Sequence, residues 1–314
     1  MRLKMKLAVR DWDYLTPLVL GDVVSSKLDI KVDRVQAVQD WAQTNDYDAG
    51  EVSFSKYVQG VAAGGYPLKC LPHFMMRGFR QRCILTSEES DITRLEDLAG
   101  KRIGVTGWSD SGNTWTRTLL RRVGVTIDDV QWYAGRLTES YPIIDRLGRF
   151  ARPGRLEATP NEKPLVDMIK DGELDALFSP FLPPEFFSDN AGLRFLLSDF
   201  RTEEVRYFNE VGYVPGIHIL GIKPALCEQH PGLAEELSEV IDESSRVWME
   251  KRTKYQDTTP WLLDDIARTR RELPATWNSN GFAPNEKMIA DFAVELYEQR
   301  VVDTRLDAKA IFPV

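Results

Sequence analysis

Histidine is scarce in this 314-residue chain, and one of its three histidines stands where the sequence pattern predicts chemistry. His218 follows a Pro-Gly bend and opens an apolar run, 218–222, that is typical of a buried strand. An imidazole titrates close to neutral pH and can donate or accept a proton. We therefore name His218 as the candidate proton donor, with a hydrogen-bonded hinge residue as the alternative. His73 and His230 are weaker candidates, at a strand end and a helix start.

Acidic side chains lie near the ends of two predicted strands. Asp13 comes after strand 3–9, and Glu51 belongs to strand 47–52. Such carboxylates could orient a phenol or bind a divalent ion. Because no His-x-His or Asp-x-Asp pattern is present, a metal ion is not indicated and we predict no cofactor, with structural capping as the alternative for either carboxylate. The neighbours expected at this site are the aromatic ring of Trp12 and the hydroxyls of Ser53 and Ser55.

Two arginines surround the turn that follows another predicted strand, 68–74. Arg77 and Arg80 lie three residues apart, with Gly78 and Phe79 between them. Guanidinium groups bind carboxylates through two parallel hydrogen bonds. Because ligands of open α/β sheets gather at strand ends, we favour a carboxylate-binding role over a solvated loop pair, with Arg80 as the stronger candidate.

A Gly/Ser/Asp-rich loop joins a buried strand, 101–105, to a predicted helix that continues over 114–122. Such a loop directs backbone N–H groups and the positive end of the helix dipole toward one spot, which predicts an anion site. Capping of the helix by the same side chains is compatible with ligand binding. The candidate residues of this site are Ser109, Ser111 and Asn113.

Strand-like and helix-like segments alternate through most of the chain, which predicts an α/β fold with mixed, mostly parallel sheets flanked by helices. The length favours two lobes, with a ligand cleft between them. We assign 1–99 and 213–314 to the first lobe and 100–212 to the second. Hydrophobic residues make up 43% of the chain and charged residues 28%, as in ordinary globular proteins.

The net charge of −8, without a basic cluster, argues against nucleic acid as a partner and leaves a small carboxylated ligand. Three cysteines without a CxxC pattern predict neither a disulfide framework nor a zinc site. No segment approaches the length of a membrane span, so no membrane partner is expected. The apolar stretch near the N-terminus is too short for a signal peptide, and we expect a cytoplasmic protein. The sequence leaves the oligomeric state, including a homo-oligomer, open.

Several of these segments together resemble the 4,5-dihydroxyphthalate decarboxylase family, which has the type 2 periplasmic-binding-protein fold. The resemblance covers nearly the whole chain. It rests on Arg10-Asp-Trp-Asp13, Tyr47-Asp-Ala-Gly-Glu51 with Ser53-Phe-Ser55, Arg77-Gly-Phe-Arg80, Gly100-Lys-Arg-Ile-Gly-Val105, Gly172-Glu-Leu-Asp-Ala176, Pro215-Gly-Ile-His218 and Gln229-His-Pro231. One departure is Gln81, at a position where the family tends to carry histidine.

The resemblance implies non-oxidative decarboxylation of a hydroxylated aromatic acid, as in aromatic catabolism. His218 would protonate the ring carbon, and Glu51 or Asp13 would be the partner of the phenol. Arg80 would hold a carboxylate together with Ser111 and Asn113. The alternative is a substrate-binding protein of an ABC importer, which holds a small carboxylated ligand without chemistry. The two differ in the number of titratable groups that converge on the ligand.

Overall fold

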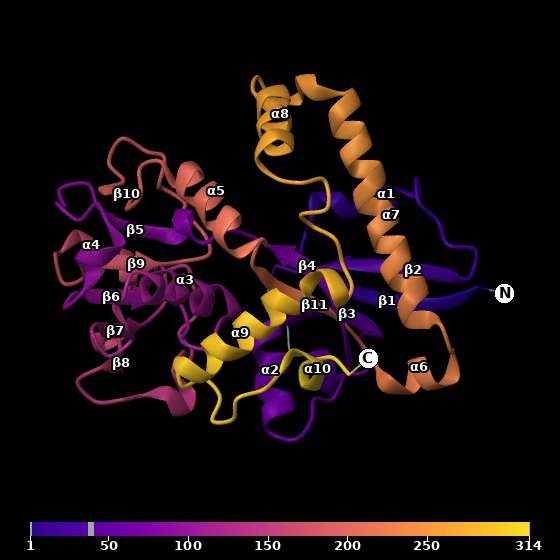
Figure 1. The fold of residues 1–314 in the computed structure, drawn as a ribbon, viewed down its shortest axis with the longest axis horizontal. Coiled ribbons are helices and arrows are strands. Elements are labelled where there is room, and N and C mark those ends of the chain that lie inside the picture. Colours follow the sequence, from indigo (N-terminus) through magenta and orange to yellow (C-terminus); the bar gives the residue numbers. More distant parts are fainter. Residues whose placement is uncertain (1, 37–40, 314) are drawn as a thin grey trace. The chain divides into compact units, whose positions relative to one another are not determined.

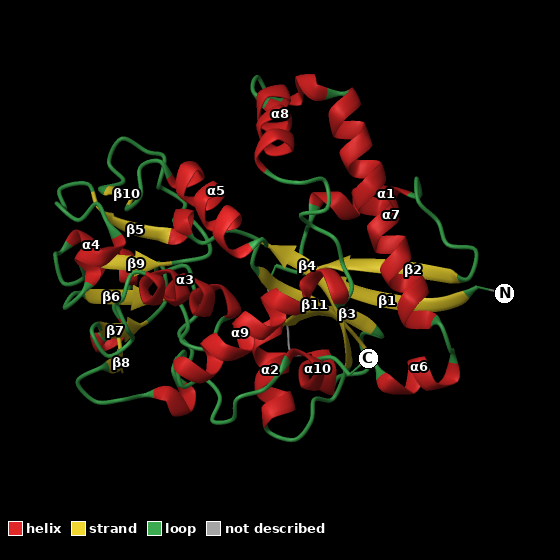
Figure 2. Ribbon diagram, viewed as in Figure 1, coloured by secondary structure: helices red, strands yellow, loops and turns green. Residues whose placement is uncertain are grey.

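The structure is a computed structural model that describes residues 2–36 and 41–313, and it divides the chain into two compact units. Unit 1 comprises 1–77, 216–287 and 308–314, and unit 2 comprises 78–215 and 288–307 (Figure 1). Each unit is built around one mixed sheet with helices packed against it (Figure 2). This confirms the predicted α/β class.

The sheet of unit 1 has the strand order β2-β1-β3-β11-β4. Its strands are β1 (Leu3–Val9), β2 (Leu28–Arg34), β3 (Ala49–Ser53), β4 (Lys69–Arg77) and β11 (Gly216–Ile222). β1 pairs in parallel with β2 and β3, whereas β11 runs antiparallel to both β3 and β4. β11 is buried along its whole length, as its mostly apolar sequence predicts.

The helices of unit 1 include one long element, α7. They are α1 (Thr16–Leu20), α2 (Phe54–Ala62), α6 (Pro224–Gln229), α7 (Leu233–Lys254), α8 (Leu262–Glu272) and α10 (Ala308–Ile311). Leu7 and Val9 of β1 pack with Leu220 of β11 in a core that α7 covers with Leu237 and Ile241. The alternation of lysine and apolar residues along β1 directs one set of side chains into this core and leaves the lysines less buried.

The sheet of unit 2 has the order β10-β5-β9-β6-β7-β8. Its strands are β5 (Ile84–Ser87), β6 (Arg102–Val105), β7 (Gln131–Ala134), β8 (Leu156–Ala158), β9 (Ala176–Phe178) and β10 (Leu193–Phe195). β6 is parallel to β7 and β9, and β5 is antiparallel to β9 and β10. The helices are α3 (Ser111–Arg122), α4 (Leu165–Lys170), α5 (Phe200–Val211) and α9 (Glu286–Glu298), of which α9 enters unit 2 at Met288.

The unit boundaries differ from the sequence assignment in two long segments and in the short segment 213–215, which belongs to unit 2. Residues 78–99 belong to unit 2, because β5 pairs with β9 and β10. Residues 288–307 also belong to unit 2, where Phe292 of α9 stacks on Trp115 of α3 at 4.9 Å between ring centroids. Both assignments depend on pairings between residues far apart in sequence. Local patterns do not report such pairings.

Local sequence signals placed most elements within a few residues. The helix predicted over 114–122 begins at Ser111, because Asp110 takes the N-cap position three residues earlier. The segment that carries Gln81 is a 3-10 turn at Gln81–Cys83, followed by β5. Within the described part of the chain, no helix is long and apolar enough to cross a membrane.

Candidate functional site

The first cluster of polar residues in unit 1 lies where β3 and β11 pair. In their antiparallel register, Leu220 faces Glu51 and His218 faces Ser53. Residues two apart on a strand share a face of the sheet, so Glu51 and His218 are diagonal neighbours. The Nδ1 of His218 lies 2.5 Å from Oε1 of Glu51. The structure therefore joins two residues that sequence reasoning had named separately.

Glu51 is almost completely enclosed, with 1% of its surface exposed. Its Oε2 accepts hydrogen bonds from the backbone N–H of Arg10 at 2.9 Å and from the indole N–H of Trp12 at 3.1 Å. Burial disfavours the carboxylate, but the hydrogen bond and charge of His218 and the N–H of Arg10 outweigh it and hold the pKa of Glu51 below its ordinary value. Glu51 is therefore ionised, and it accepts a hydrogen bond from the N–H at Nδ1 of His218.

This orientation leaves the other ring nitrogen of His218 available. The His218 side chain is 11% exposed, and no residue in the described part of the chain forms a hydrogen bond with its Nε2. Because Nδ1–H is donated to a fixed carboxylate, Nε2 is the atom that can take up or deliver a proton. The pair has the geometry of an acid–base group held by a positioning carboxylate.

A tryptophan packs behind Glu51 and fixes its backbone. The indole N–H of Trp41 donates to the Glu51 carbonyl at 3.2 Å. Gly50 makes room for this ring, since a Cβ there would lie 2.9 Å from the indole and 2.6 Å from the Ala8 carbonyl oxygen. Sequence reasoning missed both the Trp41 contact and the role of the Arg10 N–H, because backbone donors and distant indoles leave no local signature.

The remaining acidic and hydroxyl candidates of unit 1 have other partners. Asp13 lies 3.6 Å from Nη1 of Arg252 and is mostly exposed. The Ser53 hydroxyl caps α2 by accepting from the N–H of Lys56. Ser55 is fully buried, and its hydroxyl accepts from the Gln59 side chain at 3.1 Å. The Asp13 contact is an ion pair with α7, whereas the two serine contacts are a helix cap and a bond within α2.

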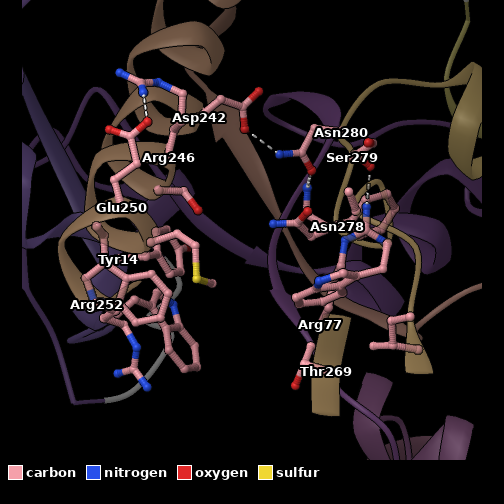
Figure 3. A pocket seen from close by; sticks show the side chains of 18 of the residues that line it. Tyr14, Arg77, Asp242, Arg246, Glu250, Arg252, Thr269, Asn278, Ser279 and Asn280 are labelled. Atoms are coloured by element: carbon pink, nitrogen blue, oxygen red, sulfur yellow. Dashed lines mark hydrogen bonds and ion pairs between the residues drawn. The ribbon is translucent and has the colours of Figure 1, made fainter. Parts of the chain in front are cut away.

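A cavity of about 1360 Å³ in unit 1 is lined in part by Trp12. Figure 3 shows side chains of its lining, among them Tyr14, Arg77 and Asn278. The wall comes from the segment after β1, the end of β4, helices α7 and α8, and residues 274–280. Trp12 both lines this cavity and donates to Oε2 of Glu51, so one side chain connects the cavity wall to the Glu51–His218 pair.

Arg77 lines that cavity and forms hydrogen bonds with other parts of unit 1. It donates to the Ser279 carbonyl at 2.9 Å and to Oδ1 of Asn285 at 2.8 Å, and its guanidinium lies 4.6 Å from the centroid of the Phe74 ring. Burial lowers the pKa of Arg77 to about 10, so it remains cationic at neutral pH. Its described contacts tie β4 to the segment that follows α8.

The arginine named as the stronger carboxylate candidate lies in unit 2, along α3. Arg80 is 3% exposed, and its Nε donates to the hydroxyl of Thr116 at 3.3 Å. Thr116 in turn donates to the Gly112 carbonyl at 2.9 Å. A Cβ on Gly112 would lie 2.9 Å from Nη2 of Arg80, so the absence of a side chain there gives the guanidinium its place. Neither Thr116 nor Gly112 was identified from the sequence.

The loop before α3 is held mainly by Asn113. Its side-chain amide donates to the hydroxyl of Thr106 at 3.1 Å and to the Gly107 carbonyl at 2.8 Å. Ser111 and Asn113 are buried, whereas Ser109 is partly exposed. Next to Arg80, Gln81 folds back so that its Oε1 accepts from the Arg80 N–H at 3.1 Å. In the described residues, no group of three His, Cys, Asp or Glu side chains is placed to hold a metal ion.

Comparisons with known proteins identify relatives across the whole chain. Residues 27–146 match the family model described as NMT1/THI5 like. The 4,5-dihydroxyphthalate decarboxylase of Comamonas testosteroni is 28% identical over 99% of this chain and 96% of the relative. The enzyme of the same name from Pseudomonas putida is 31% identical over 63% of this chain and 78% of the relative.

Solved structures with the same fold include both a binding protein and an enzyme. The periplasmic aliphatic sulphonate binding protein SsuA of Escherichia coli matches with a TM-score of 0.58 at 16% identity, covering 98% of this chain and 97% of that one. The desulfurization enzyme DSZB matches with a TM-score of 0.50 at 15% identity, covering 98% and 96%. These matches confirm the predicted periplasmic-binding-protein fold, and at such identities they show the fold alone.

Proposed function

Because the chain belongs to the 4,5-dihydroxyphthalate decarboxylase family, we propose that it removes carbon dioxide from a hydroxylated, phthalate-like aromatic acid without an oxidant. The observation that carries the proposal is the Glu51–His218 pair, in which a buried carboxylate fixes Nδ1 of His218 and leaves Nε2 open. A binding protein needs no such proton-transfer pair. The pair therefore favours chemistry over binding alone.

The chemical step needs one proton and releases one molecule of carbon dioxide. The protonated His218 delivers the Nε2 proton to the ring carbon that carries the carboxylate. The bond between that carbon and the carboxylate then breaks, its electrons return to the ring, and aromaticity is restored. Solvent reprotonates His218, so the net reaction consumes one proton and requires neither oxidant nor reductant.

Glu51 acts in this scheme as a positioning residue. Its two oxygens are already occupied by His218, Arg10 and Trp12, and its hydrogen bond with Nδ1 fixes the orientation of the His218 ring. The aromatic wall that Trp12 contributes to the neighbouring cavity suits a flat ring. Asp13, which lies by Arg252, has no role in this scheme.

Incubation with 4,5-dihydroxyphthalate and separation of the products tests the proposal. We expect 3,4-dihydroxybenzoate and one equivalent of carbon dioxide, and in D₂O we expect one deuterium at the ring position that the carboxylate left. Phthalate, which lacks the phenols that activate the ring, should stay unchanged. If a panel of hydroxylated aromatic di-acids is recovered intact while those acids raise the melting temperature, the protein is a binding protein and the proposal fails.

A binding protein without chemistry is the second candidate, supported by the likeness to SsuA. The likeness to DSZB shows that the same fold also occurs in an enzyme, so the fold does not choose between the two. Analysis of the products distinguishes an enzyme from a binding protein.

A further inference from the structure

Unit 2 contains a buried cation in an electrostatically unfavourable place. The guanidinium of Arg80 runs along α3, with Nε at Thr116 in the second turn and Nη2 beside Gly112 in the first turn. Its terminal nitrogens therefore point toward the N-terminus of the helix. That end of a helix carries a partial positive charge, which favours anions and opposes cations.

The terminal nitrogens of Arg80 have no hydrogen-bond partner in the described residues. Nη2 is buried and has no hydrogen bond, and among the described residues no acceptor bonds Nη1 and no carboxylate forms an ion pair with Arg80. Buried polar groups in native proteins are almost always paired, and an unpaired buried charge is more costly still. An oxyanion at this position would satisfy the guanidinium and the helix N-terminus together.

We propose that Arg80 and the first turn of α3 form a carboxylate-binding site within unit 2. The two terminal nitrogens offer parallel donors that match the spacing of carboxylate oxygens. The amides of Gly112 and Asn113 belong to the first turn, where N–H groups have no carbonyl within the helix to bond. Thr116 is the positioning residue, because its hydroxyl accepts from Nε and is itself fixed by the Gly112 carbonyl.

This site goes beyond the proposed function, because binding a carboxylate requires no reaction. The test can therefore use a compound that is not turned over, and failure of the decarboxylation proposal would leave this one standing. Phthalate is the probe, with benzoate and sulfate as a smaller carboxylate and an inorganic anion. Binding is measured by calorimetry on the full chain, in parallel with thermal melting without ligand.

We expect Arg80→Gln to weaken phthalate binding by about 10- to 150-fold, the scale of one partly desolvated charged hydrogen bond. Without ligand, the melting temperature of this variant should stay the same or rise, because an uncompensated buried charge has been removed. Arg80→Lys should recover only part of the affinity, since it keeps the charge and loses the planar pair of donors. A purely structural arginine would instead lower the melting temperature when replaced and leave phthalate binding intact.

Arg82→Gln is the matched control, because Arg82 lies two residues away, is 49% exposed and is already paired with Glu204 at 3.0 Å. We expect its phthalate affinity to remain within about twofold of the parent. Gly112→Ala places a Cβ against Nη2 and should weaken binding in the parent but cause no further loss in the Arg80→Gln protein.

Equal losses of phthalate affinity in Arg80→Gln and Arg82→Gln would mean that the anion is attracted only by the overall positive charge of this region. That result would overturn the proposal. Unchanged affinity of Arg80→Gln for all three anions would also overturn it. If Arg80→Gln does not fold, Arg80→Lys and Gly112→Ala decide the question by the same measurements.

Discussion

The polar clusters of the two units differ in how far the protein satisfies its own charged group. In unit 1, both oxygens of Glu51 are occupied, by His218, Arg10 and Trp12. In unit 2, the terminal nitrogens of Arg80 have no partner among the described residues. A charge that must hold another residue through a reaction is best fixed by protein groups, whereas a charge that receives a ligand is left open. The contrast supports the two proposals, which place chemistry at the first cluster and carboxylate binding at the second.

The strongest way to break this comparison is to remove the imidazole. We expect His218→Ala to lower turnover of 4,5-dihydroxyphthalate by about 100-fold or more, because general acid catalysis contributes at least that much. Phthalate affinity should stay within about twofold, since the proposed carboxylate site is formed by Arg80 and the first turn of α3. His230→Ala is the control, because His230 is exposed at the end of α6. Full turnover in His218→Ala would remove this residue from the mechanism, and a parallel loss of phthalate affinity would erase the division between the clusters.

The sequence predicted much of what forms locally and little of what forms across the chain. Alternation along β1, the apolar run of β11 and the loop before α3 placed these elements within a few residues. The chemistry of single residues also pointed to His218 and Arg80. Propensity and spacing carry this information because a helix or strand is specified by its own side chains.

The hydrogen-bond partners of His218 and Arg80 could not be predicted from the sequence. Glu51 and His218 are 167 positions apart and meet only through the register of β3 with β11. Thr116 is 36 positions from Arg80, and its hydroxyl position becomes informative only once α3 lies beside the arginine. For the same reason, the sequence assigned residues 78–99 to the first lobe, whereas they belong to unit 2. A single sequence contains no record of long-range pairing, and so the pairing of Glu51 with His218 and the contact of Thr116 with Arg80 were missed.

A second prediction compares a buried glutamate from each unit by its effect on stability. Glu51 has a lowered pKa in the folded protein, so its ionised form stabilises the fold above its ordinary value of 4.5 and that contribution disappears as the pH falls through the folded value. We expect Glu51→Gln to reduce the free energy of unfolding by about 1.5 to 3 kcal/mol at pH 7, with the difference closing at acid pH. Denaturant unfolding at several pH values measures this.

Glu204 of unit 2 provides the opposite case. Burial raises its pKa against the opposing effects of Arg82, so its contribution is greatest at low pH and falls as the pH rises through the folded value. Glu204→Gln should therefore match or exceed the stability of the parent at pH 7. If both glutamine variants show the same pH dependence, Glu51 is not the fixed carboxylate that the comparison requires.

The smallest effect should come from a single donor of the unit 1 cluster. Trp12→Phe keeps an aromatic wall beside the cavity and removes only the indole N–H that donates to Oε2 of Glu51 at 3.1 Å. The N–H of Arg10 still holds that oxygen, so the carboxylate should shift slightly and remain ionised.

One hydrogen bond to a charged group is worth about 1.5 kcal/mol at the low end, which predicts roughly a 10-fold loss of turnover in Trp12→Phe. Trp277→Phe is the control, since Trp277 lines the same cavity and has no described hydrogen bond to Glu51. Steady-state kinetics of Trp12→Phe should show a larger change in kcat than in KM. The reason is that the lost hydrogen bond orients Glu51, which in turn orients the proton donor His218. An equal loss in both variants would mean that the aromatic wall matters and the hydrogen bond does not, and Glu51 would then need only Arg10 to hold it in place.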